Sequence, residues 1–68
     1  MQYAMIIEKG ETNYSAYFPD LPGCIATGKT LDEVKQRMSE ALEMHLRGMR
    51  EDGLPLPEPS LVEYVDAA

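Results

Sequence analysis

The chain has 68 residues, of which 44% are hydrophobic, and its 12 acidic and 6 basic side chains give a formal net charge of −6. A chain this short makes one small domain, which we assign to residues 1–68. A core of this size supplies only about 3–5 kcal/mol of folding stability, so a further stabilising element is expected, such as a disulfide, a metal or a partner chain. A single cysteine excludes an internal disulfide, and no Cys/His cluster indicates a metal or cofactor. We therefore expect another protein chain to stabilise it.

The charge and the hydropathy also restrict the kind of partner. Nucleic-acid binders usually carry a basic stripe, so the acidic balance disfavours direct binding of DNA or RNA. A basic protein partner fits the charge better. The longest apolar run, Ala4–Ile7, is far below the roughly 20 residues of a membrane span, and no signal-peptide pattern is visible. We predict a cytoplasmic protein that makes no membrane contact.

The first part of the chain predicts three strands. Tyr3–Glu8 and Tyr14–Phe18 alternate β-forming side chains, and the turn residues of Gly10–Asn13 between them favour an antiparallel hairpin. Pro19–Gly23 predicts a rigid loop, because proline ends a strand and glycine permits a tight turn. Cys24–Thr27 then predicts a short third strand.

The strongest local pattern predicts a helix from about Leu31 to about Asp52. Thr30 and Glu33 form a capping box at its start. Gly53 is suited to the position just after the helix, and Pro55 prevents continuation. The apolar residues recur at helical spacing, so one face of the helix is expected to pack on the sheet. Two favourable (i, i+4) ion pairs are expected: Glu33 with Arg37, and Glu43 with Arg47.

The chain after the helix predicts a return to the sheet. Gly53–Ser60 is spaced by prolines and should be extended and stiff, and Leu61–Val65 predicts a final strand. The order β-β-β-α-β indicates an α+β fold, with a small, mainly antiparallel sheet and one helix on one face. The other face and at least one sheet edge then stay uncovered, which is typical of a protein interface.

Three kinds of active chemistry find little support in the sequence. Cys24 falls in a predicted strand and His45 on the apolar stripe of the helix, which favours packing roles over a nucleophile and its base. A metal-dependent nuclease would need several carboxylates at one point. A base-stacking platform would need basic residues among the aromatic ones. The sets concerned are Glu8, Glu63 and Asp66 for the nuclease, and Tyr14, Tyr17, Phe18 and Tyr64 for the platform.

Three motifs in order resemble the HicB-like antitoxin family: Tyr17–Cys24 (YFPDLPGC), Thr27–Glu33 (TGKTLDE) and Glu51–Ser60 (EDGLPLPEPS). The resemblance implies a β-β-β-α-β domain with a partial ribonuclease-H-like fold and no catalytic residues. It also implies a function. Such antitoxins bind and block a small basic HicA-type toxin, which is an mRNA-cleaving ribonuclease.

The resemblance leaves two hypotheses open. Many members carry a further DNA-binding domain, and because this sequence stops at Ala68 we expect no operator binding by this chain. The alternative to a toxin-binding module is a toxin-independent homo-oligomer with a structural or regulatory role, and a dimer or higher oligomer is compatible with both. The residues predicted to contact a partner are Tyr17, Phe18, Asp20, Leu21, Glu40 and Glu43.

Overall fold

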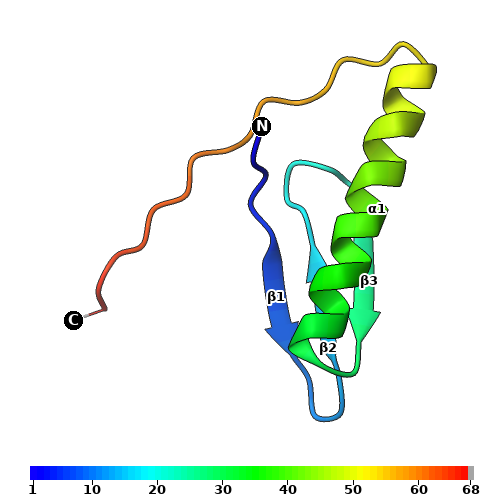
Figure 1. The fold of residues 1–68 in the computed structure, drawn as a ribbon. Coiled ribbons are helices and arrows are strands. Elements are labelled where there is room, and N and C mark those ends of the chain that lie inside the picture. The colour runs from blue at the N-terminus through cyan, green and yellow to red at the C-terminus, as the bar shows by residue number, and fades with distance from the viewer. Residues whose placement is uncertain (68) are drawn as a thin grey trace.

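The computed structural model describes residues 1–67, and Ala68, the last residue of the predicted domain, lies outside them. Three strands, β1 (Ile6–Lys9), β2 (Tyr14–Tyr17) and β3 (Ile25–Gly28), form an antiparallel sheet in the order β1-β2-β3. The helix α1 (Leu31–Glu51) lies across one face, mainly against β3 and β2 (Figure 1). The predicted α+β class, with one helix on one face of a small antiparallel sheet, is confirmed. No helix within these residues combines the length and apolarity needed to cross a membrane.

Strand register divides the sheet side chains between two faces. Ile7, Ala16 and Ala26 lie in one row across the three strands, and all three belong to or pack against the core under α1. The neighbouring row points away from the helix and is described below. Each strand has only four residues, so the strands are shorter than or offset from the predicted ones.

The core is small and lies between α1, the sheet and the loop that follows β2. Val34 and Met38 supply the helix side of it and are fully buried. Gly28 lies beneath the first turn of α1, where a Cβ atom would stand 2.7 Å from the Val34 backbone nitrogen. The helix can therefore approach the end of β3 closely only because residue 28 has no side chain. The buried hydrophobic residues are Ala16, Phe18, Leu21, Cys24, Val34 and Met38.

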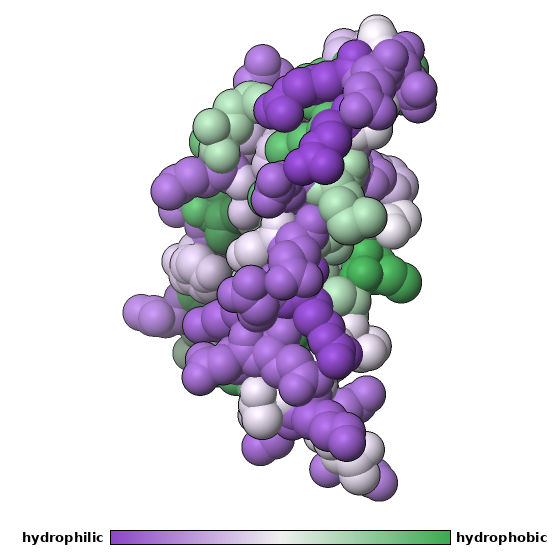
Figure 2. Space-filling model, turned by 45° about the vertical axis from the view of Figure 1, so that its right-hand side comes forward, coloured by the Kyte–Doolittle hydropathy of each residue, from purple (hydrophilic) through white to green (hydrophobic). Residues whose placement is uncertain are grey.

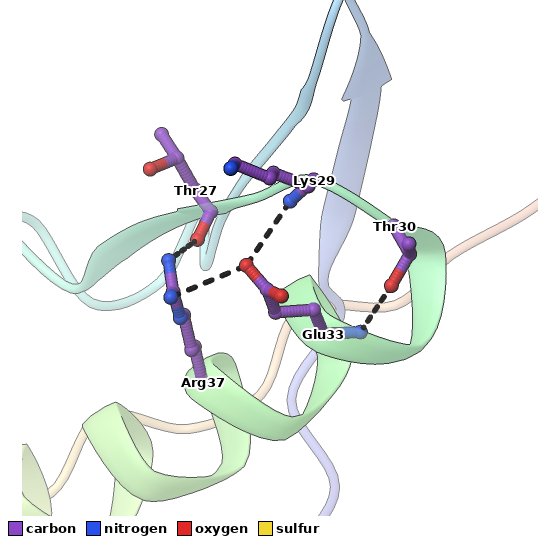
Figure 3. Close-up of polar contacts among 5 residues, drawn as sticks. All are labelled: Thr27, Lys29, Thr30, Glu33 and Arg37. Carbon is purple, nitrogen blue, oxygen red and sulfur yellow. Dashed lines mark hydrogen bonds and ion pairs between the residues drawn. The ribbon is translucent and has the colours of Figure 1, made fainter.

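The corner between β3 and α1 is fixed by a chain of polar contacts (Figure 3). Thr30 caps the helix, because its Oγ1 accepts the Glu33 N–H at 3.1 Å. The Glu33 carboxylate accepts the Lys29 N–H at 3.1 Å and pairs with Arg37 at 3.2 Å. Arg37 also donates to the Thr27 carbonyl at 2.8 Å. The predicted cap and this ion pair are confirmed. Together they show that the second motif, Thr27–Glu33, stabilises the start of the helix.

The C-terminal end of α1 is closed by a two-bond cap. Gly53 has φ of 71°, and its N–H donates to the Arg50 carbonyl at 3.1 Å. The Leu54 N–H donates to the Met49 carbonyl at 2.8 Å. These are the two bonds of a Schellman motif, which needs a residue in the left-handed region. The predicted position of Gly53 after the helix is confirmed.

The first family motif forms two consecutive turns between β2 and β3. The Leu21 N–H donates to the Phe18 carbonyl, and the Cys24 N–H donates to the Leu21 carbonyl, each at 3.1 Å. Proline occupies the second position of each turn, and Gly23, with φ of 86°, occupies the third position of the second turn. That arrangement is typical of a type II turn. The turns bury Leu21 almost completely between the two strands and the helix.

The chain after α1 crosses back over the top of the sheet without joining it (Figure 1). The Tyr3 hydroxyl donates to the Pro57 carbonyl at 2.7 Å, and Ser60 donates to the Asp20 carboxylate from its N–H at 2.9 Å and from its hydroxyl at 2.5 Å. Residues 61–67 are extended and belong to no sheet. The prediction of a final strand at Leu61–Val65 is therefore wrong for the single chain, because a strand exists only when an edge pairs with it.

Candidate protein interface

The six residues predicted to contact a partner fall in three different environments. Phe18 and Leu21 are core residues, 6% and 1% exposed, so in this conformation they offer almost no surface to a partner. Their place in the core follows from the two turns, which point both side chains inward. Tyr17 is exposed on the face of the sheet opposite the helix. Asp20 lies in the first turn and is engaged by Ser60.

The remaining two, Glu40 and Glu43, are exposed on the outer side of α1. Each already has a partner, because Gln36 donates to Glu40 at 3.0 Å and Arg47 pairs with Glu43 at 3.0 Å. The second predicted ion pair of the helix is thus confirmed. In the view of Figure 2 most of the surface is hydrophilic, and hydrophobic residues emerge only in small patches.

The negative charge of the chain gathers after the helix rather than on it. The sequence of α1 holds five acidic and four basic side chains, so the helix surface is close to neutral. The following stretch holds four acidic side chains and no basic one: Asp52, Glu58, Glu63 and Asp66. A count of the charged residues in each segment would have located this acidic stretch from the sequence alone. Most of the net negative charge of the chain therefore lies on the connector and the residues beyond it.

An apolar row crosses the face of the sheet that α1 leaves open. Ile6, Tyr17 and Ile25 are directly opposite one another on β1, β2 and β3, and they are 39%, 38% and 68% exposed. We call these three residues the open-face row. Tyrosine beside aliphatic side chains is the composition that protein interfaces favour. Only Tyr17 of the row was predicted from the sequence as a contact residue, although the strand alternation also carries the signal for Ile6 and Ile25.

A second exposed apolar element follows Ser60. Leu61, Tyr64 and Val65 are each at least 90% exposed, and Val62 is half-exposed. We call Leu61–Val65 the 61–65 segment. Large apolar side chains this exposed mark an interaction surface in a folded protein.

Asp20 connects the turns to the connector. The hydroxyl of Ser60, and then its N–H, hold the pKa of the Asp20 carboxyl below its ordinary value of 3.8, because both donors favour the carboxylate. The folded-state pKa is thus lower than the unfolded one. The contact accordingly favours the docked connector above the ordinary pKa, and this contribution is lost as the pH falls through the folded-state pKa.

This link predicts a specific change in titration. We expect Ser60→Ala, which removes the hydroxyl donor, to move the pKa of Asp20 upward toward its ordinary value, as followed by NMR of the carboxyl carbon. Asp66→Asn, an acidic position in the same stretch, serves as the control and should leave the Asp20 titration unchanged. An Asp20 pKa that is the same in Ser60→Ala and the wild type would show that the contact does not form in solution.

The chemistries considered from the sequence are not assembled by the fold. Cys24 and His45 line the same shallow depression, but burial raises the pKa of the Cys24 thiol, which is opposite to the activation a nucleophile requires. Within residues 1–67 no three His, Cys, Asp or Glu side chains gather as a metal site would require. The aromatic set is dispersed: Phe18 is in the core, Tyr17 lies on the open face, and Tyr64 lies on the 61–65 segment.

The geometry defines a class: a small α+β domain with one open sheet face, exposed apolar side chains and an acidic stretch after its helix. The family comparison agrees with this class. Residues 3–68 match the model described as the HicB_like antitoxin of bacterial toxin-antitoxin system, and the chain belongs to this family.

Relatives of the chain occur in phage, archaea and bacteria. A protein from the rep-hol intergenic region of Haemophilus phage HP1 is 40% identical over 63 residues, which cover 93% of this chain but only 47% of the phage protein. A UPF0150 protein of Archaeoglobus fulgidus is 43% identical over 56 residues, covering 78% of this chain and 81% of that protein. A UPF0150 protein of Helicobacter pylori is 39% identical over 49 residues, which cover 72% of this chain and 68% of that protein.

A solved structure extends the comparison from sequence to fold. A chain in a HicA3 and HicB3 toxin-antitoxin complex superposes with a TM-score of 0.73 at 32% sequence identity. The match covers 88% of this chain and 70% of that chain. The similarity therefore includes most of the domain described above.

Proposed function

We propose that this chain is an antitoxin module that binds and neutralises a small basic toxin of the HicA kind, an mRNA-cleaving ribonuclease. The observation that carries the proposal is the similarity, in sequence and in fold, to a chain of the HicA3 and HicB3 complex. Membership of the antitoxin family supports it independently. In this proposal the chain has no catalytic role and acts by occupying the toxin surface.

Two surface features fit such a partner. The open-face row supplies apolar contact area, and a tyrosine at its centre is the kind of residue that dominates binding energy. The acidic stretch after α1 supplies a negative potential that attracts a basic toxin and speeds encounter. We therefore propose that the contact surface consists of the open face of the sheet and the acidic stretch, and no longer includes the buried turn residues Phe18 and Leu21. Asp20, Glu40 and Glu43 remain candidates at its margins.

The cellular compartment follows from the partner. A toxin that cleaves mRNA acts in the cytoplasm, so an antitoxin that blocks it must be present there. The single cysteine is buried, and its thiol is preserved in a reducing compartment.

Substitutions in the open-face row should weaken toxin binding without unfolding the chain. We expect Tyr17→Ala to reduce affinity roughly 10-fold to 100-fold, because truncation of a central interface tyrosine commonly costs about 1.4–2.8 kcal/mol. Ile25→Ser should have the same direction of effect. Isothermal titration calorimetry with the toxin measures the affinity, and rescue of growth on co-expression measures neutralisation.

The control lies on the other side of the molecule. Lys35→Ala, on the exposed outer side of α1, should leave affinity within about twofold. Circular dichroism should show the same helix content in all three variants. Binding that is unchanged in both row variants would remove the open face from the interface, and the absence of any complex with the wild type would count against the proposed function itself.

A toxin-independent homo-oligomer is the second candidate, and one observation favours self-association: the exposed 61–65 segment. Self-association is compatible with toxin binding.

A further inference from the structure

The open face of the sheet carries two rows of different chemistry. The open-face row is apolar. Two residues along each strand a second row crosses the same face, because side chains alternate between the faces with a period of two. We call this second row the polar row, and its members, which are exposed and directly opposite one another on β1, β2 and β3, are Glu8, Ser15 and Thr27. The open face thus offers an apolar strip beside a polar strip that contains one carboxylate.

Glu8 gives the polar row its charge, since Ser15 and Thr27 are neutral hydroxyl residues. Neither of the two ion pairs found within residues 1–67 includes Glu8. Complementary charges fix the register of an interface, so an exposed carboxylate beside an apolar strip selects a partner with a cation in the matching place. The open face therefore fits a surface on which apolar side chains adjoin a basic one.

The dimensions of the open face suit one helix. Three strands about 4.8 Å apart span about 10 Å, and an α-helix with its side chains is about 10–12 Å wide. The opposite face shows the same match, because α1 covers it and runs roughly along the strands (Figure 1). The two rows are about 6.8 Å apart along the strands, close to the rise of about 5.4 Å in one helical turn. A second helix in this direction can therefore place an apolar residue over the open-face row and a basic residue over Glu8.

No part of the chain within residues 1–67 covers the open face. The side chains of both rows are exposed, and the 61–65 segment, whose own apolar side chains are exposed too, runs away from the sheet (Figure 1). A sheet face that carries apolar side chains is normally packed against a further layer of structure. That layer is then supplied by another molecule.

We propose that the open face binds one amphipathic helix of a basic partner protein, whose apolar stripe lies on the open-face row and whose lysine or arginine, one turn along, pairs with Glu8. The inference rests on the proposed function, which supplies the partner, a toxin of the HicA kind. Binding completes a three-layer arrangement of helix, sheet and helix. A neutral or acidic helix with the same apolar stripe is disfavoured, because it would desolvate the Glu8 carboxylate without pairing it.

Glu8 separates this arrangement from a purely apolar contact. We expect Glu8→Gln to weaken toxin binding about 5-fold to 10-fold at 50 mM salt, and Glu8→Lys by roughly 30-fold or more, as measured by isothermal titration calorimetry. The matched control is Glu11→Gln, which makes the same change of charge in the exposed turn before β2 and should stay within about twofold of the wild type. The difference between Glu8→Gln and the wild type should shrink at 300 mM salt, because salt screens an exposed pair.

NMR of the complex identifies the element of the toxin that is bound. Intermolecular NOEs from the methyl groups of Ile6 and Ile25 should reach toxin side chains that are three or four residues apart, which is the spacing of one helix face. NOEs to toxin residues that are two apart would overturn the proposal, because that spacing belongs to a strand.

Three further results would overturn the proposal. Equal affinity of the toxin for the wild type, Glu8→Gln and Glu8→Lys would place the toxin on another surface and leave the proposed function intact. Ile6 and Ile25 methyl signals that shift when this chain alone is diluted would show that a second copy occupies the face, and NOEs from the 61–65 segment to these methyl groups in the dilute chain would show that the segment does. The absence of any complex with the wild type would remove both this proposal and the proposed function.

Discussion

Gly28→Ala is expected to remove a large part of the free energy of unfolding of the chain. The new Cβ atom would stand 2.7 Å from the nitrogen and 3.0 Å from the Cα of Val34, both of them backbone atoms of the helix. The helix must then lift away from β3, and overpacking of this kind costs about 1–3 kcal/mol or more. Since a domain of this size has only about 3–5 kcal/mol in total, urea denaturation should show a strongly reduced or absent transition.

Gly48→Ala is the matched control for this prediction. Gly48 lies inside α1, and a Cβ atom there would meet nothing within 4 Å. Replacing glycine by alanine in a helix interior should therefore stabilise the chain by about 1 kcal/mol. The same substitution thus has opposite signs at two positions. A Gly28→Ala protein as stable as the wild type would contradict the close approach of α1 to β3.

Leu21→Ala is the second substitution with a large expected effect. Leu21 is 1% exposed in the loop between β2 and β3, where it packs with residues of the helix and of the sheet. Truncation of a buried leucine costs about 2–5 kcal/mol, which is comparable to the whole stability of the domain. We expect loss of the cooperative thermal transition, measured by circular dichroism.

The comparison for Leu21 is an exposed residue of similar size. Met44 lies on α1 and is 69% exposed, so Met44→Ala should change the free energy of unfolding by no more than about 0.5 kcal/mol. If Leu21→Ala destabilised the chain as little as Met44→Ala, the loop could not be part of the core.

The sequence predicted the helix and its ends well because the signals there are local. A cap joins Thr30 to Glu33, ion pairs join residues four apart, and Gly53 closes the last turn. All of these depend on neighbours within one or two turns. The fold class followed from the order of such elements and from the alternation in the strands.

The burial of two of the predicted contact residues could not be predicted from the sequence, because burial is not a local property. Phe18 and Leu21 occur beside Pro19 and Pro22 in a motif that resembles an exposed loop. Two consecutive turns direct both side chains into the core instead, and this direction depends on packing against a helix distant in sequence. The open-face row was missed in part for the same reason, since only the sheet register brings Ile6, Tyr17 and Ile25 together.

The final strand could not be predicted from the sequence for a different reason. The residues of the 61–65 segment have strand-forming character, but strand formation depends on an available edge. In the single chain the contacts of Pro57 and Ser60 hold the connector so that the segment does not reach one. The prediction of a strand becomes correct only if another chain supplies the edge.

The most direct test of the central claim is titration of this chain with its proposed partner, a small basic toxin of the HicA kind, at 50 mM and 300 mM salt. We expect a complex with submicromolar affinity at low salt, weakened at least tenfold at high salt, and loss of the toxin's RNA cleavage when the complex is formed. No detectable complex at 100 µM, or a complex in which RNA cleavage continues at the same rate, would contradict an antitoxin function for this chain.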